Sequence, residues 1–111
     1  MPREYKKFTV KISLPAKHDL AEIIKYIARN NPQHARSITD RIEARINSLD
    51  QFPERGALVP ELLDRNVSDF RQLIESSWKI IYRIDNDTVH ILAIVDSRRN
   101  LKDILIKKLV K

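Results

Sequence analysis

Four stretches of the chain are predicted to be β-strands, most clearly where apolar and polar residues alternate with a two-residue period. The alternation is clearest after Trp78, where Trp78, Ile80, Tyr82 and Ile84 share one face and Lys79, Ile81, Arg83 and Asp85 share the other. The last stretch is aliphatic on both faces, as expected of a strand in the middle of a covered sheet. Strands are predicted at residues 8–14, 69–75, 78–84 and 88–95.

Between the first two strands the apolar period changes to that of a helix. Leu20, Ile23, Ile24 and Ile27 follow helical spacing after Pro15, and this helix should end near Asn30. Asn31 and Pro32 then provide an N-cap residue and a first-turn proline. A second apolar stripe follows, at Ala35, Ile38, Ile42, Ile46 and Leu49. The pattern predicts a helical hairpin whose two stripes face one core.

The remaining segments carry weaker signals. Phe52 and Pro53 should end the second helix, and a turn is expected at Gly56, the only glycine in the chain. Residues 61–64 could add one helical turn. Apolar residues at helical spacing from Leu101 indicate a short C-terminal helix or tail.

This order of elements predicts one α+β domain over residues 1–111, with an N-terminal strand, a helical hairpin, a three-stranded antiparallel meander and a short C-terminal helix or tail. The hairpin can cover only one face of the sheet. The second face should therefore be solvated or occupied by a partner. We expect Arg71, Lys79 and Arg83 to line it.

Charge is distributed unevenly along the chain. The net charge is +6, and residues 97–111 carry six basic residues against one acidic residue. This asymmetry favours attraction to a polyanion or an acidic protein, although exposed lysines on a last helix could serve solubility alone. The histidines, His18, His34 and His90, lie at unrelated spacings and cysteine is absent, so neither a metal nor another cofactor is expected.

The chain shows no sign of a membrane or export segment. No apolar run approaches the roughly 20 residues that a bilayer requires. The N-terminus lacks the apolar region and cleavage site of a signal peptide. We expect a cytoplasmic protein.

The most concentrated candidate chemistry lies at the end of the last strand. Asp96, Ser97, Arg98 and Arg99 follow directly on the aliphatic run. Cations at the end of a central strand are a common way to present a binding or catalytic surface on a rigid scaffold.

The ordered set of motifs resembles the RelE/ParE superfamily of toxins from type II toxin–antitoxin pairs, with more likeness to the ParE-like members. The likeness covers nearly the whole chain. It rests on Ala16-x-x-Asp19-Leu20-x-x-Ile23-x-x-Tyr26-Ile27, Asn31-Pro32, Phe52-Pro53-x-x-Gly56-x-x-Val59-Pro60-Glu61-Leu62, Phe70-Arg71-x-Leu73, Trp78-Lys79-Ile80-Ile81-Tyr82-Arg83 and Ile91-Leu92-Ala93-Ile94-Val95-x-x-Arg98-Arg99.

The resemblance implies a growth-inhibiting toxin, of a kind linked to plasmid stabilisation, that a cognate antitoxin neutralises through an acidic or amphipathic C-terminal segment. ParE-like toxins poison DNA gyrase and are not enzymes. RelE-like toxins bind the ribosome and cut mRNA. A third alternative is a basic binding module, or a non-toxic relative that retains only antitoxin binding.

If the chain is RelE-like, the resemblance implies that Arg71, Lys79, Arg98 and Arg99 form the catalytic set. Such a nuclease also needs a group that transfers a proton. Neither tyrosine nor histidine follows His90, and Asp96 is the remaining candidate base. Tyr82 is expected to point into the core and His90 to be packed. The absence of a terminal tyrosine or histidine favours the ParE-like alternative.

Overall fold

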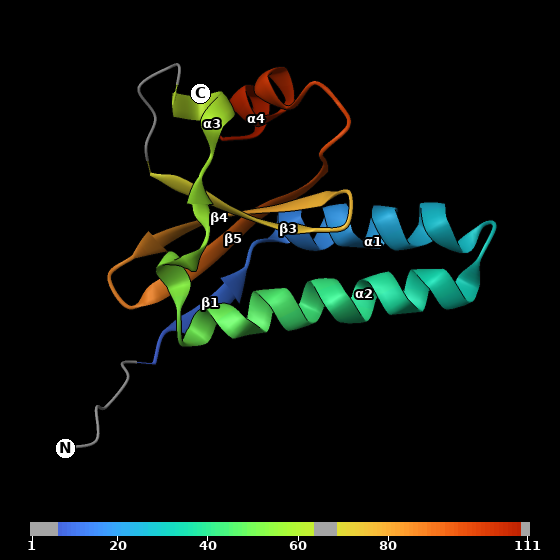
Figure 1. The fold of residues 1–111 in the computed structure, drawn as a ribbon, viewed down its shortest axis with the longest axis horizontal. Coiled ribbons are helices and arrows are strands. Elements are labelled where there is room, and N and C mark those ends of the chain that lie inside the picture. Colours follow the sequence, from blue (N-terminus) through green and yellow to red (C-terminus); the bar gives the residue numbers. More distant parts are fainter. Residues whose placement is uncertain (1–6, 64–68, 110–111) are drawn as a thin grey trace.

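A computed structural model describes residues 7–63 and 69–109 of the chain. It contains a five-stranded sheet with the helical hairpin on one face and two short helices on the other (Figure 1). The predicted α+β architecture is confirmed. Residues 64–68, which include the last residue of the helical turn predicted at 61–64, lie outside the described residues.

The sheet has the strand order β1-β5-β4-β3-β2. Strands β3, β4 and β5 form the predicted antiparallel meander, while β1 pairs in parallel with β5 and the short β2 pairs antiparallel with β3. The sequence does not predict β2, because a two-residue strand has no detectable period. The strands are β1 (Thr9–Ile12), β2 (Ala57–Leu58), β3 (Phe70–Glu75), β4 (Trp78–Asp85) and β5 (Thr88–Asp96).

The hairpin consists of α1 (Leu14–Ala28) and α2 (Pro32–Asn47), which a 3₁₀ turn at Ser48–Asp50 continues. Helix α1 begins two residues before the predicted start. The Ser13 side chain accepts a hydrogen bond from the backbone N–H of Ala16 at 3.2 Å and caps the helix. Pro15 then lies in the first turn, where its missing N–H has no consequence.

Helix α2 begins as predicted. The Asn31 side chain accepts a hydrogen bond from the His34 N–H at 3.0 Å, and Pro32 is the first helical residue. Its apolar stripe is buried at Ala35, Ile38, Ile42 and Ile46. The stripes of α1 and α2 pack against the sheet residues Leu73, Trp78, Ile80, Tyr82, Val89 and Ile91 to form the first core cluster.

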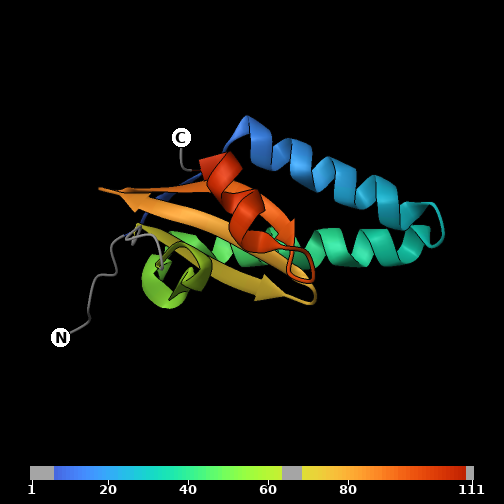
Figure 2. The same ribbon diagram turned by 90° about the horizontal axis from the view of Figure 1, so that it is seen from above.

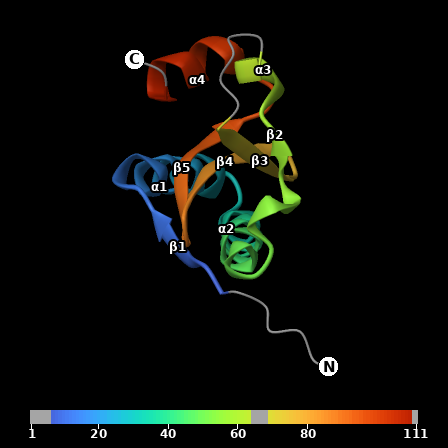
Figure 3. The ribbon, with the colours of Figure 1, turned by 90° about the vertical axis from the view of Figure 1, so that its left-hand side faces the viewer.

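The second face of the sheet is not open, which corrects the expectation that solvent or a partner covers it. Two short helices, α3 (Pro60–Leu63) and α4 (Leu101–Leu109), lie over it (Figures 2 and 3). Their buried side chains join Val59, Phe70, Ile81, Ala93 and Val95 in a second core cluster. The domain therefore has three layers, and the C-terminal segment is a helix that completes a core.

The alternation of side chains along β5 shifts by one residue where the pairing with β4 is irregular. Ile81 lies opposite Ala93 but Tyr82 lies opposite Ile91, so Leu92 is an extra residue on β5. Ile91 and Ile94 consequently both face the hairpin, while Ala93 and Val95 face the other helices. This bulge contributes to the unbroken apolar run in the sequence.

Among the described residues, no helix has the length and apolar character needed to cross a membrane.

Candidate functional site

Arg71 lies on the same face of the sheet as the hairpin. It is directly opposite Tyr82 on β4, which belongs to the hairpin-side core. Its Nη1 donates hydrogen bonds to the carbonyl oxygens of Gly56 at 2.8 Å and Glu54 at 3.2 Å. Arg71 therefore fixes the loop that precedes β2.

Tyr82 on β4 also holds this loop in place. Its hydroxyl donates a hydrogen bond to the Pro53 carbonyl at 2.6 Å and accepts one from the Gly56 N–H at 3.0 Å. The side chain is fully buried, which agrees with the expected core position. Burial raises the pKa of the Tyr82 hydroxyl above its ordinary value, and this effect exceeds the lowering by the Gly56 hydrogen bond.

Position 56 requires glycine because there is no room for a side chain, and not because of its backbone conformation. Its φ of −74° is open to any residue. A Cβ at this position would overlap the Tyr82 hydroxyl and would come within 2.6 Å of the Gln72 carbonyl oxygen. The predicted turn at the only glycine is thus a close approach of the loop to β3 and β4.

Lys79 lies on the opposite face, beside α3. Its Nζ forms an ion pair with Glu61 Oε2 at 3.2 Å, and both side chains are largely shielded from water. The expectation that Arg71 and Lys79 line one face is wrong. Each strand alternates as predicted, but the register places Arg71 opposite Tyr82, whereas Lys79 lies two residues from the second-cluster residue Ile81. Arg83 shares the side of Lys79 and is exposed.

Arg98 lies in the turn after β5 and pairs with Asp96. Its Nε and Nη2 contact the two carboxylate oxygens at 2.9 and 2.8 Å, and its backbone N–H also bonds to Oδ1 at 2.9 Å. These hydrogen bonds hold the pKa of Asp96 below its usual range and raise that of Arg98. An ionised, engaged Asp96 is poorly suited to act as a base.

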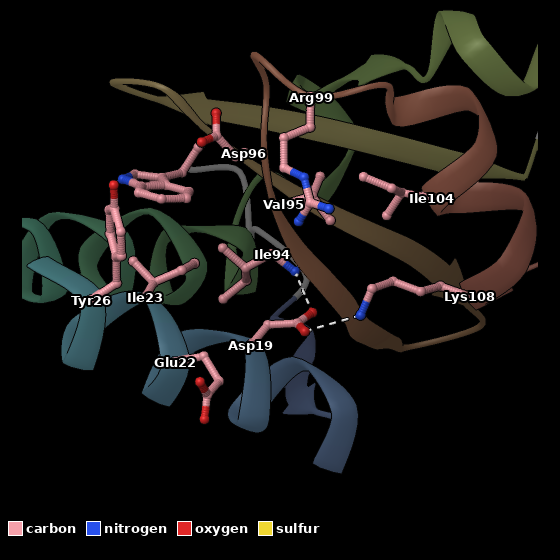
Figure 4. A pocket seen from close by; sticks show the side chains of 11 residues that line it. Asp19, Glu22, Ile23, Tyr26, Ile94, Val95, Asp96, Arg99, Ile104 and Lys108 are labelled. Carbon is pink, nitrogen blue, oxygen red and sulfur yellow. Dashed lines mark hydrogen bonds and ion pairs between the residues drawn. The ribbon is translucent and has the colours of Figure 1, made fainter.

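Arg99 differs from the other three cations. It is exposed, and its guanidinium has no hydrogen-bond or ion-pair partner within residues 7–63 and 69–109. It extends over a cleft of about 490 Å³ between α1, the end of β5 and α4 (Figure 4). The structure therefore brings Arg98 and Arg99 together in the turn after β5, whereas Arg71 holds the loop before β2 and Lys79, opposite Val95, is paired with Glu61.

Asp19 belongs to the motif that carries the family resemblance, and the sequence alone assigns it no role. Its Oδ2 accepts a hydrogen bond from the Ile94 N–H at 3.0 Å, and its Oδ1 pairs with Lys108 Nζ at 3.0 Å. One carboxylate thus joins α1, β5 and α4. The helical position of Asp19 gives no signal of this, because both partners come from distant segments.

None of the three histidines lines the cleft beneath Arg99. His18 and His34 are exposed on the hairpin, and His90 is half-buried in β5 opposite Arg83. Within the described part of the chain, no group of three or more histidine, cysteine or acidic side chains could hold a metal ion.

Comparison with known proteins identifies the family. The family model described as "ParE toxin of type II toxin-antitoxin system, parDE" matches residues 10–101. The chain belongs to this family. It is a toxin of the RelE/ParE superfamily, as the ordered motifs of the sequence indicated.

Two relatives from Caulobacter vibrioides carry the names of both branches of the superfamily. Toxin ParE3 is 31% identical over 99 residues, which cover 85% of this chain and 91% of the relative. Toxin RelE1 is 31% identical over 87 residues, which cover 78% and 90%. Sequence identity therefore does not separate a ParE-type from a RelE-type activity.

Solved structures agree on the fold. A chromosomal ParDE system from P. aeruginosa aligns with a TM-score of 0.68 at 22% identity, covering 82% of this chain and 97% of the other. The RelBE2 toxin–antitoxin complex from Mycobacterium tuberculosis aligns with a TM-score of 0.59 at 20% identity, covering 81% and 98%.

Proposed function

We propose that this ParE-family toxin inhibits growth by binding DNA gyrase, without catalysing a reaction, and that a cognate antitoxin neutralises it. The observation that carries this proposal is the dispersal of the cations that an RNase of the superfamily would need. Arg71 and Lys79 lie on opposite faces of the sheet, and Arg98 lies in a turn with Asp96.

RNA cleavage requires cations that converge on one phosphate and a group that transfers a proton. Arg71 instead holds backbone carbonyls, Lys79 is paired with Glu61, and Arg98 is paired with Asp96. Neither tyrosine nor histidine follows His90 in the chain. These contacts support a protein that acts by binding.

The proposed antitoxin is supported by the relatives and by the surface. The two structural neighbours are described as a ParDE system and a RelBE2 toxin–antitoxin complex. Large apolar side chains of this chain are exposed, among them Tyr26 at 65% and Ile74 at 53%. A segment that orders on binding can cover such dispersed patches around a small domain.

The test is a supercoiling assay with purified DNA gyrase, relaxed plasmid and ATP. The toxin should inhibit supercoiling, and prior addition of the antitoxin from the neighbouring reading frame should restore it. A matched assay should show intact mRNA on translating ribosomes. Normal supercoiling at toxin concentrations well above those that arrest growth would overturn the gyrase proposal.

The second candidate is ribosome-dependent mRNA cleavage, which the 31% identity to Toxin RelE1 and the adjacent exposed arginines Arg98 and Arg99 favour. In that case Arg98→Ala should lower cleavage by about 10²-fold. Arg29→Ala, at the exposed end of α1, is the matched control and should leave cleavage unchanged. Induced expression without any growth defect would favour the non-toxic binding module instead.

A further inference from the structure

A cleft lies between α1, the end of β5 and α4, on the side of the sheet where β1 stops. β1 pairs with β5 only as far as Ile12 and Ile91, while β5 continues to Asp96. The last residues of β5 thus have no strand on that side. Helix α1 and helix α4 form the two walls of the resulting cleft, of about 490 Å³ (Figure 4).

The floor of the cleft is apolar and built from the core. Ile23, Trp78, Ile94 and Val95 line it, each less than one-tenth exposed. Tyr26 stands on the α1 wall with 65% of its surface in water. An apolar side chain of a partner could therefore enter between Tyr26 and α4 and bury surface against a rigid floor.

Most of the charged side chains around the cleft form ion pairs within the domain. Asp19 is paired with Lys108, and Asp96 with Arg98. Arg99 has no such partner within the described ranges, and its guanidinium extends over Val95 into the cleft (Figure 4). Glu22 belongs to the outer rim, and its carboxylate points away from Arg99 in the same view.

We propose that this cleft docks a peptide segment that carries a carboxylate beside a bulky aliphatic residue, with the carboxylate on Arg99 and the aliphatic side chain on the Ile23–Ile94 floor. Charge complementarity supports this docking, because Arg99, which has no ion-pair partner among residues 7–63 and 69–109, overhangs an apolar floor. We assign this peptide segment to the antitoxin, and in this respect the proposal rests on the proposed function.

The peptide does not bind as an added β-strand. Strand addition needs free backbone groups along the edge of the sheet. Asp19 already accepts the N–H of Ile94, and Ser13 Oγ contacts the carbonyl of Leu92. Recognition at this cleft is therefore made through side chains.

The test uses the full-length protein and two acetylated, amidated pentapeptides, Ala-Leu-Glu-Leu-Ala and its glutamine counterpart. Titration is followed by NMR through the Trp78 indole N–H and the Ile23 and Ile94 methyl groups. The glutamate peptide should shift these signals and bind about fivefold more tightly than the glutamine peptide. Arg99→Gln should abolish that preference.

Lys107→Gln is the matched control, because it removes the same charge from an exposed α4 residue that does not line the cleft. It should retain the preference. Tyr26→Ala should weaken both peptides equally, since it removes a wall without touching the charge. Each variant alters an exposed side chain, and its NMR spectrum reports whether the fold is intact.

Three outcomes would overturn the proposal. Equal binding of both peptides would contradict carboxylate recognition, and unchanged Trp78 and isoleucine signals would exclude the cleft as the site. Shifts that depend on protein concentration without peptide would identify a second copy of this chain as the occupant. The experiment contains neither gyrase nor antitoxin, so its failure is distinguishable from a failure of the proposed function.

Discussion

Arg71 and Arg99 were expected in one site, but they occupy opposite kinds of environment. Arg71 donates to two backbone carbonyls of the loop at Pro53–Arg55 and Gly56, in a region that the buried Tyr82 also holds. Arg99 belongs to an exposed turn and has no partner within the described ranges. The first arginine stabilises the fold, and the second is available to another molecule.

The difference shows that the partner of a cation, and not its residue type, decides its role. Arg71 directs Nη1 at two loop carbonyls, so turning the guanidinium toward a phosphate would break the hydrogen bonds that hold the loop. A guanidinium without a partner keeps its full capacity for a carboxylate or phosphate. Only the three-dimensional contacts distinguish the two, and stability measurements can test the distinction.

Gly56→Ala should give the largest effect. The new Cβ would overlap the Tyr82 hydroxyl and would lie within 2.6 Å of the Gln72 carbonyl oxygen, so the loop must move. We expect a loss of about 3 kcal/mol in the free energy of unfolding, measured by urea denaturation. Ala57→Ser, on the exposed neighbouring residue, is the control and should change little.

A double-mutant cycle sharpens this prediction. In a Tyr82→Phe background the nearest atom is absent, so Gly56→Ala should cost less than in the natural protein. An equal cost in both backgrounds would mean that the Gln72 carbonyl, and not the Tyr82 hydroxyl, sets the requirement for glycine.

The sequence predicted the hairpin side of the domain well, because its signals are local. The stripe from Ala35 to Ile46 has helical period, and Asn31 with Pro32 marks the start of α2. The alternation after Trp78 correctly assigned Tyr82 to the hairpin face. Each of these signals is contained in one element, so neither the register nor the packing has to be known.

The other face was missed because its core is assembled from distant, short segments. Leu62 comes from a helix of one turn, and Leu101 and Leu105 come from a C-terminal helix of nine residues. The helical spacing from Leu101 is visible in the sequence, but nothing there shows that Leu62, Leu101 and Leu105 meet Ile81 and Ala93 on one face of the sheet.

The sequence could not show for a related reason that Arg71 and Lys79 lie on different faces of the sheet. Alternation tells which residues of one strand share a face, but the pairing of two strands decides which faces coincide. Arg71 falls opposite Tyr82, and this register separates it from Lys79. The sequence did place Arg98 and Arg99 correctly at the end of β5, since adjacent residues need no register.

Tyr82→Phe should have the second largest effect. It removes a donor to the Pro53 carbonyl and an acceptor of the Gly56 N–H, both in a buried position. Leaving these groups without partners should cost about 2 kcal/mol in the free energy of unfolding. Thermal and urea unfolding of the natural protein and the variant at neutral pH provide the measurement.

The same variant should change the response to alkali. Burial raises the pKa of Tyr82 in the folded protein above its ordinary value of 10.0, so the unfolded chain ionises first as the pH rises. The contribution is therefore complete below pH 10 and is lost as the pH increases from there to the folded pKa. Tyr82→Phe should abolish this part of the alkaline loss, and an unchanged pH profile would contradict the assignment.

Arg71→Met and Arg99→Met test the comparison directly. Methionine keeps much of the apolar stem and removes the guanidinium. Arg71→Met should cost about 1.5 kcal/mol, because two loop carbonyls lose their donor. Arg99→Met should change stability by less than about 0.5 kcal/mol. Equal effects would show that the two arginines do not differ in role.

Asp96→Asn should have the smallest effect on stability and should act mainly at acid pH. The hydrogen bonds from Arg98 lower the pKa of Asp96 in the folded protein below the ordinary value of 3.8. Its contribution is thus present above that value and is lost as the pH falls through the lower, folded pKa. Because Arg98 is 69% exposed, the contribution is small and salt should weaken it.

The Asp96→Asn variant also distinguishes the role of Arg98 from that of Arg99. Without the carboxylate, Arg98 becomes a second free cation in the turn, while Arg99 keeps its place over the cleft. Binding of a short fluorescent RNA, followed by anisotropy at low salt, should increase in this variant and fall again in Asp96→Asn combined with Arg98→Gln. If RNA binding is unchanged by Asp96→Asn, the carboxylate does not restrain Arg98.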